Sequence, residues 1–122
     1  MRENIDVGLP ALQQPFSWMV RAGNVLYTAH GPVKADGSID TGPIERQTRL
    51  TLDNLKRAVE SAGKTMDDVA QVLIYMSDVA DMPAIDAIYR EYFRPPWPNR
   101  SSAGVALVVP GMKIELVAYV VA

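Results

Sequence analysis

The last strand-sized segment of the chain, residues 112–121 (MKIELVAYVV), is apolar on both of its faces. Side chains alternate between the two faces of a strand, and the outward set here is Val117, Tyr119 and Val121 or its alternate, Ile114, Leu116, Ala118 and Val120. A chain of 122 residues builds one domain around one core. In a two-layer domain that core covers one face of the strand, so something else must bury the other face. Self-association of the chain is the simplest way to bury it.

The first half of the chain carries the patterns of a hairpin and a helix. Two short apolar segments, residues 17–21 and 25–29, flank a glycine and predict a β-hairpin. An apolar stripe at steps of three and four residues then predicts a helix that begins at Pro43 and ends at Gly63. The stripe consists of Ile44, Thr48, Leu52, Leu55, Val59 and Ala62.

The second half of the chain carries a strand, a helix and a second hairpin pattern. Residues 69–77 (VAQVLIYMS) form a nearly continuous apolar run and predict a strand that is buried on both faces. A second helix is expected after Asp81, and the sequence PPWP ends it. Residues 100–108 and the last segment flank Pro110 and Gly111, which predict a type II turn and hence a final hairpin.

These elements follow one another in the order β-β-α-β-α-β-β. The order predicts a two-layer α+β fold with a mainly antiparallel sheet and two helices on one face. No repeat, linker or low-complexity tract interrupts the chain. We therefore expect residues 1–122 to form a single domain.

Composition excludes several classes of function. The chain has no cysteine, so disulfides, thiolate nucleophiles and cysteine-bound metals are excluded. The net charge of -2 argues against a partner that is nucleic acid or an anionic membrane surface. We find no signal segment and no apolar stretch of membrane-spanning length, so we expect a cytoplasmic protein. Glycine-rich phosphate-binding motifs are absent and there is one histidine, so we expect neither a bound cofactor nor a metal.

Five short segments resemble the YjgF/Rid family. They are residues 47–63 (QTRLTLDNLKRAVESAG), 67–69 (DDV), 88–93 (IYREYF), 98–101 (PNRS) and 113–115 (KIE). Together they cover nearly the whole chain and keep the order of the family's elements. The resemblance implies a chorismate-mutase-like (ferredoxin-like) fold and a homotrimer with clefts between subunits. It also implies hydrolysis of reactive imines and enamines to 2-oxo acids and ammonia, although other members have been called ribonucleases, chaperones or translation inhibitors.

The resemblance implies two catalytic residues, Arg100 and Glu115. Arg100 matches the family arginine that binds the substrate carboxylate, and a guanidinium suits that task because it donates two parallel hydrogen bonds. Glu115 matches the family glutamate near the attacking water. The alternatives are a surface salt bridge for Arg100, and for Glu115 a pairing with Lys113 or with an arginine across an interface.

The expected final hairpin separates these two residues. If the turn centres between Pro110 and Gly111, Glu115 lies opposite Ala106 and Arg100 lies opposite Val121. At about 3.3 Å per residue the two would then be roughly 20 Å apart. An arginine side chain cannot cover that gap, so a shared site would need residues from different subunits.

The resemblance also marks substrate-binding positions, several of which depart from the family pattern. They are Phe16 (usually Tyr), Ala29 and His30 (where Ser and Gly are usual), Gly31, Asp86 (usually Asn) and Ser102 (usually Cys). Asp86 would repel an anionic substrate unless it pairs with a cation. We therefore expect a substrate other than simple 2-aminoacrylate, either larger or carrying a positive group. His30 is a candidate proton donor or ligand contact, or else a core or surface histidine, and Trp97 could cap the cleft.

The leading hypothesis is a metal-free hydrolytic deaminase that acts on a small imine or enamine bearing a carboxylate. The alternative is a non-catalytic trimer that binds small carboxylates or metabolites. A third reading is a ribonuclease or translation inhibitor, and the acidic balance of the chain argues against it.

Overall fold

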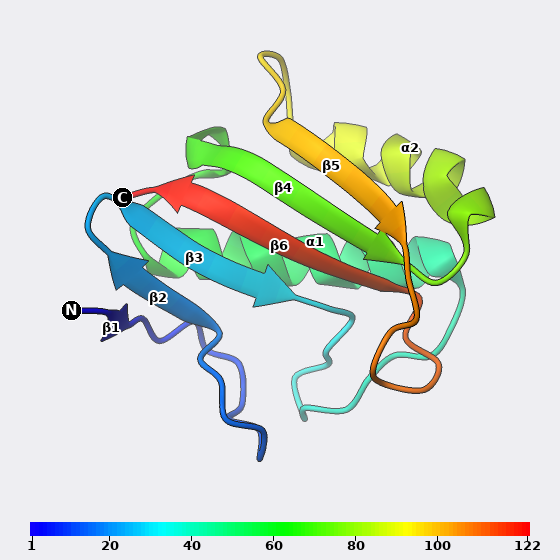
Figure 1. The fold of residues 1–122 in the computed structure, drawn as a ribbon, viewed down its shortest axis with the longest axis horizontal. Coiled ribbons are helices and arrows are strands. Elements are labelled where there is room, and N and C mark those ends of the chain that lie inside the picture. The colour runs from blue at the N-terminus through cyan, green and yellow to red at the C-terminus, as the bar shows by residue number, and fades with distance from the viewer.

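The computed structural model describes residues 1–122 and shows the predicted two-layer α+β fold (Figure 1). Six strands form one sheet in the order β1-β2-β3-β6-β4-β5, and two helices lie behind it in Figure 1. The strands are β1 (Glu3–Asn4), β2 (Met19–Ala22), β3 (Val25–His30), β4 (Val69–Met76), β5 (Asn99–Gly104) and β6 (Ile114–Val121). The helices are α1 (Ile44–Ser61) and α2 (Met82–Tyr92), with short 3-10 turns at Met66–Asp68 and Val79–Asp81. Among the strands, only β1, a two-residue strand paired with β2, was not expected from the sequence.

The core lies between the helices and one face of the sheet. On the central strand β6, the helix-facing residues Ile114, Leu116, Ala118 and Val120 are at most 1% exposed. The residues that alternate with them face away from the helices, and Val121 is 51% exposed. No element of the chain covers this second face, which we call the open face of the sheet (Figure 1).

Strand β4 follows the same alternation, so the expectation that it is buried on both faces is wrong for the single chain. Val72, Ile74 and Met76 face the helices and are buried. Leu73 and Tyr75 face the open side and are only partly buried. The apolar run is continuous because both faces carry apolar side chains, but the fold supplies a covering layer for only one of them.

The expected final hairpin is also wrong, although its turn forms. The Met112 N–H donates to the Val109 carbonyl at 3.1 Å, and Gly111 has the positive φ, 82°, of a type II turn. However, β5 pairs in parallel with β4, and β6 pairs antiparallel with the other edge of β4. Turn chemistry fixes a local reversal of the chain, but it does not decide which strands pair. Both edges of β6 are taken by β3 and β4, so β5 pairs with the free edge of β4.

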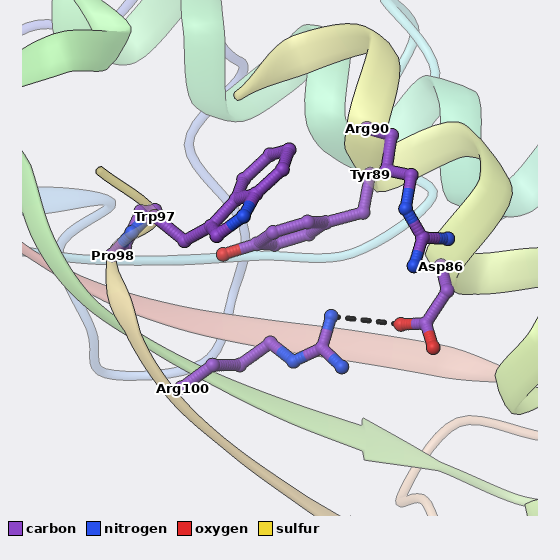
Figure 2. A pocket seen from close by; sticks show the side chains of 6 residues that line it. All are labelled: Asp86, Tyr89, Arg90, Trp97, Pro98 and Arg100. Carbon is purple, nitrogen blue, oxygen red and sulfur yellow. Dashed lines mark ion pairs between the residues drawn. The ribbon is translucent and has the colours of Figure 1, made fainter. Parts of the chain in front are cut away.

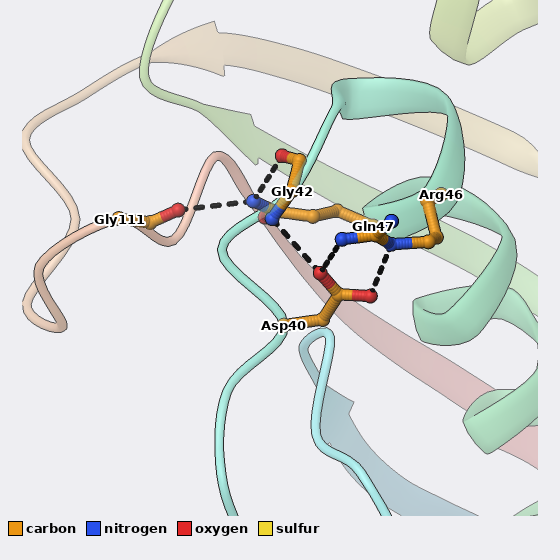
Figure 3. A network of polar contacts seen from close by, with 5 residues as sticks. All are labelled: Asp40, Gly42, Arg46, Gln47 and Gly111. Atoms are coloured by element: carbon orange, nitrogen blue, oxygen red, sulfur yellow. Dashed lines mark hydrogen bonds and ion pairs between the residues drawn. The ribbon is translucent and has the colours of Figure 1, made fainter.

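Gln47 connects the start of α1 to the turn that precedes β6 (Figure 3). Its side chain is fully buried. The Nε2 group donates to the carbonyls of Gly42 and Gly111, both at 3.0 Å, and Oε1 accepts from the Lys113 N–H at 2.8 Å. One side chain thus holds the entry to α1 and the entry to β6 together.

An ion pair supports the same corner of the fold. Asp40 accepts from the Gly42 N–H at 2.8 Å and pairs with Arg46 at 2.7 Å. The Arg46 hydrogen bond, followed by that of Gly42, lowers the pKa of Asp40 to about 2. The carboxylate therefore stays charged at neutral pH and fixes the loop that leads into α1.

His30 at the end of β3 belongs to the helix-facing core and is 1% exposed. The Thr28 hydroxyl donates its single proton to the Trp18 carbonyl at 2.8 Å. His30 Nε2, 2.7 Å from that hydroxyl oxygen, must therefore be the donor to it. His30 Nδ1 is then a bare acceptor with no partner. Burial lowers the pKa of His30 from 6.5 to about 4, so the imidazole is neutral at pH 7.

Replacing Gln47 with Leu should destabilise the fold by about 3 kcal/mol, because the Lys113 N–H and two carbonyls lose a buried partner. Urea denaturation measures this loss. Lys56→Ala, on the exposed side of the same helix, is the control and should change stability by less than about 0.5 kcal/mol. Equal stability of wild type and Gln47→Leu would contradict this role of Gln47.

The buried neutral His30 should make the fold less stable in mild acid. Its pKa is lower in the folded chain than in the unfolded chain, so below pH 6.5 the unfolded state takes up more protons and stability falls with pH down to about 4. Between pH 7 and pH 4.5 we expect wild type to lose about 2 to 3 kcal/mol more than His30→Gln. Carboxylates that titrate in this range are common to both proteins and cancel in the difference. Parallel pH dependence of the two unfolding free energies would refute the assignment.

Candidate active site

Arg100 lies on the edge strand β5 and points toward α2. It is paired with Val72, which is a helix-facing residue of β4, so its side chain lies on the helix side of the sheet. Arg100 Nη1 is 2.8 Å from Asp86 Oδ1, and each of the two side chains is 28% exposed. The guanidinium carbon lies 4.8 Å from the centroid of the Tyr89 ring. Arg100 is thus held by an ion pair and a cation–π contact, both from α2.

These residues line a pocket of about 210 Å³ (Figure 2). Its walls are Asp86, Tyr89 and Arg90 of α2 together with Trp97, Pro98 and Arg100. Figure 2 shows the Arg100 side chain extending beneath the Tyr89 ring toward Asp86. The pocket contains two guanidinium groups and one carboxylate, so it carries a net positive charge and favours an anionic ligand.

Tyr89 can add a hydrogen bond to this pocket. Its hydroxyl is buried and has no partner in the protein. Burial raises the pKa of Tyr89 to about 12, and the Arg100 charge only partly opposes that change. The phenol is therefore neutral at pH 7 and has a proton to donate to a ligand.

Glu115 lies on the open face of the sheet, near one end. It is opposite Tyr75 of β4, which also faces the open side. Ala29 is opposite Val117, so Ala29 is a diagonal neighbour of Glu115 on the same face. Partial burial among these apolar neighbours raises the pKa of Glu115. The carboxylate is consequently a stronger base than an exposed glutamate.

Gly31 follows β3 at this same end of the sheet. A Cβ atom at Gly31 would lie 3.2 Å from the Met112 sulfur, so the backbone approaches the start of β6 closely. The Gly31 carbonyl accepts from Asn54 Nδ2 at 3.1 Å, and the Val33 carbonyl accepts from the same group at 2.9 Å. Asn54 of α1 therefore fixes the backbone at Gly31 in the way that Gln47 fixes the entry to β6.

The expected catalytic residues do not meet within one chain. Arg100 lies on the helix side of the sheet, and Glu115 lies on the open side. The strand pairings from which we expected Arg100 and Glu115 to be far apart are wrong. Glu115 is opposite Tyr75 rather than Ala106, and Val121 is opposite Val25 rather than Arg100. The separation itself persists because the sheet lies between the two side chains.

The remaining expected positions are spread over both sides. Ser102 is exposed on β5, two residues from Arg100 and on the same side. Phe16 is 48% exposed and packs edge-on against Trp18, with ring centroids 4.8 Å apart. His30 lies inside the core, stacked on Trp18 at 5.8 Å, and lines neither group of residues. No group of three or more His, Asp or Glu side chains is placed to hold a metal ion.

Two pocket residues, Tyr89 and Arg90, were not expected from the sequence. Tyr89 falls in the expected second helix and in the segment 88–93, but no role in a site was expected for it from the sequence. Arg90 follows Asp86 by four residues, a spacing that places both side chains on one face of a helix. That spacing is the signal that could have identified Arg90.

Comparison with known proteins identifies the family. The family model described as "Endoribonuclease L-PSP" matches residues 9–122. A "2-iminobutanoate/2-iminopropanoate deaminase" of Dermatophagoides farinae is 34% identical over 109 residues, which cover 88% of this chain and 85% of that protein. A "3-aminoacrylate deaminase RutC" of Acinetobacter baylyi is 34% identical over 112 residues, which cover 89% of this chain and 88% of that protein.

A solved structure agrees in fold over nearly the full length. The crystal structure of E. coli TdcF with bound serine superposes with a TM-score of 0.88 at 27% identity, and the match covers 98% of both chains. No helix of the present chain is long and apolar enough to cross a membrane. The chain belongs to the YjgF/Rid (RutC, L-PSP) family.

Proposed function

We propose that this protein hydrolyses a small imine or enamine that bears a carboxylate, giving a 2-oxo acid or related carbonyl compound and ammonia. The observation that carries the proposal is the Arg100 guanidinium, which points into a positively charged pocket beneath Tyr89. The deaminases at 34% identity are named for substrates that combine a carboxylate with an imine or enamine nitrogen. The serine bound by TdcF also carries a carboxylate.

Arg100 is the proposed anchor for the substrate carboxylate. A guanidinium stays charged at any working pH and binds a carboxylate through two parallel hydrogen bonds. The neutral Tyr89 hydroxyl donates a further hydrogen bond to the ligand. Backbone groups near Gly31 and Ser102 complete the cradle, with Phe16 and Ala29 beside it.

Glu115 is the proposed base. Water adds to the imine carbon while Glu115 accepts one of its protons, and the nitrogen takes up a proton as it leaves as ammonia. The carbon–nitrogen double bond is replaced by a carbonyl, with one water consumed for each ammonia released. The raised pKa of Glu115 favours the proton transfer. Imine hydrolysis has a low intrinsic barrier, so a held substrate and an oriented water are sufficient apparatus.

The proposed site lies between copies of the chain. Arg100 and Glu115 are on opposite sides of the sheet, and the open face exposes apolar side chains, including Tyr27 at 40% and Val121 at 51%. Burying this face against a neighbouring copy would bring Glu115 of one copy to Arg100 of the next. A homotrimer with three equivalent sites satisfies both requirements.

A second candidate function is binding of small carboxylates without turnover. The observation that favours it is the ion pair between Asp86 and Arg100, because it neutralises the proposed anchor. This candidate predicts binding of 2-oxo acids in the pocket and no loss of imines.

An imine-trapping assay separates these two functions. An amino-acid oxidase generates imines from a panel of amino acids, and semicarbazide competes for them. Wild type should slow semicarbazone formation, and Arg100→Ala should lower this activity by about 100-fold or more because the carboxylate loses its anchor. Arg49→Ala is a matched control, since Arg49 pairs with Glu91 outside the pocket. Unaltered semicarbazone formation with wild type across the panel would reject the deaminase and favour the binding function.

Mixed trimers test whether the site is shared between copies. Arg100→Ala and Glu115→Gln should each be inactive alone. When the two are co-expressed and mix at random, about one quarter of the sites combine an intact Arg100 with an intact Glu115, so about one quarter of wild-type activity should return. In light scattering, we expect the mass of an assembly of three 13.4 kDa chains. Mixed trimers without regained activity would show that the site lies within one copy.

A further inference from the structure

We propose that Asp86 is a displaceable counter-ion of Arg100, and that Arg90 receives the Asp86 carboxylate when a ligand carboxylate takes its place. The inference rests on the proposed function in one respect, that a carboxylate binds at Arg100. It adds a specificity-determining role for Asp86 and Arg90. It also assigns the ligand to a class, the small monocarboxylates.

The free protein already has a carboxylate at the proposed anchor. Asp86 Oδ1 lies 2.8 Å from Arg100 Nη1. The Tyr89 ring, 4.8 Å from the guanidinium carbon, covers one side of the group. An incoming carboxylate therefore meets Asp86 at the forked end of Arg100. Two carboxylates on one guanidinium in a partly buried pocket repel each other, so Asp86 must move for the ligand to bind at full strength.

Arg90 is placed to receive the displaced carboxylate. It follows Asp86 by four residues on α2, and both side chains line the same pocket (Figure 2). An acidic residue four positions before a basic one is the favourable order for an ion pair along a helix. Arg90 takes part in none of the four ion pairs of the chain. The exchange then requires Asp86 to change its rotamer.

The charges of the pocket support the same exchange. Without ligand, two guanidinium groups face one carboxylate, which leaves one positive charge unbalanced. A ligand with one carboxylate balances it, and the pairs become ligand with Arg100 and Asp86 with Arg90. A second negative charge on the ligand would exceed the cations available in the pocket. This balance selects a monocarboxylate over a dicarboxylate.

A double-mutant cycle measured by calorimetry tests the exchange, with 2-oxobutanoate as the probe. Asp86→Asn should bind the probe about 10-fold more tightly than wild type, because the competing charge is removed. Arg90→Gln should bind it about 5-fold more weakly, because Asp86 has no second partner. In the Asp86→Asn background, Arg90→Gln should change the affinity by less than about 2-fold. Arg49→Gln removes a positive charge outside the pocket and should leave binding unchanged.

A second measurement starts from the wild-type protein, in which the expected signal does not depend on the folding of any variant. The Arg90 Nε–H resonance, followed by NMR, should shift on addition of 2-oxobutanoate as Asp86 arrives. The same resonance should stay in place when the probe is added to Asp86→Asn.

The possible failures are distinct. An equal effect of Arg90→Gln on affinity in both backgrounds would overturn the exchange. So would an Arg90 resonance that does not shift in wild type. In either case, binding that still depends on Arg100 would leave the proposed function intact. Weaker binding by Asp86→Asn would show that Asp86 assists the ligand and would also overturn it. Binding that survives Arg100→Ala, or no binding by wild type, would remove the anchor and with it both the proposed function and this inference.

Discussion

The fold depends on two buried amide side chains of α1. They hydrogen-bond backbone N–H and carbonyl groups of loops, which have no partner in a helix or strand. Gln47 hydrogen-bonds the turn before β6, and Asn54 hydrogen-bonds the segment after β3. Buried backbone groups without partners are costly, so these contacts decide where the two loops lie. The loops in turn fix Gly31 and Glu115 at one end of the open face. The helix thus sets the geometry of the sheet end from the opposite side.

The position of Arg100 follows from a different constraint, the connection between β4 and β5. The two strands are parallel and neighbours in the sheet, so the chain must cross over between them, and α2 forms that crossover. A crossover helix packs against the strands that it joins. Arg100 is the first residue of β5 whose side chain points toward the helices. Asp86 and Tyr89 of α2 therefore contact it. Topology brings the ion pair and the cation–π contact together before any ligand is present.

Much of this was predictable from the sequence, and the errors have a common cause. The spacing of apolar residues identified both helices and the main strands, because each pattern is local. Pro110 and Gly111 identified a real turn, yet β3 and β4 occupy both edges of β6, so β5 pairs with β4, far away in the sequence. With β5 assigned to the wrong neighbour, the ion pair between Asp86 and Arg100 could not be anticipated. The strand–helix–strand order of residues 69–104 already contained the correct alternative, a parallel crossover.

The open face links assembly to chemistry in the proposed trimer. Burial alone raises the pKa of Glu115 in the single chain, and no hydrogen bond or opposite charge counteracts it. Covering the open face with a second copy would remove more water from this carboxylate and raise its pKa further, which makes it a better base.

The same contact would bring the Arg100 guanidinium of the neighbour toward Glu115, and that positive charge lowers the pKa of Glu115. The pKa of Glu115 would therefore depend on whether the neighbour's Arg100 is paired with a carboxylate. That carboxylate is Asp86 before the ligand binds and the ligand's own carboxylate afterwards. A guanidinium that is already paired opposes the raised pKa less than a free one. In such a site, Arg100 is paired with Asp86 before the substrate binds and with the ligand carboxylate afterwards, so Glu115 stays ready to accept a proton in both states.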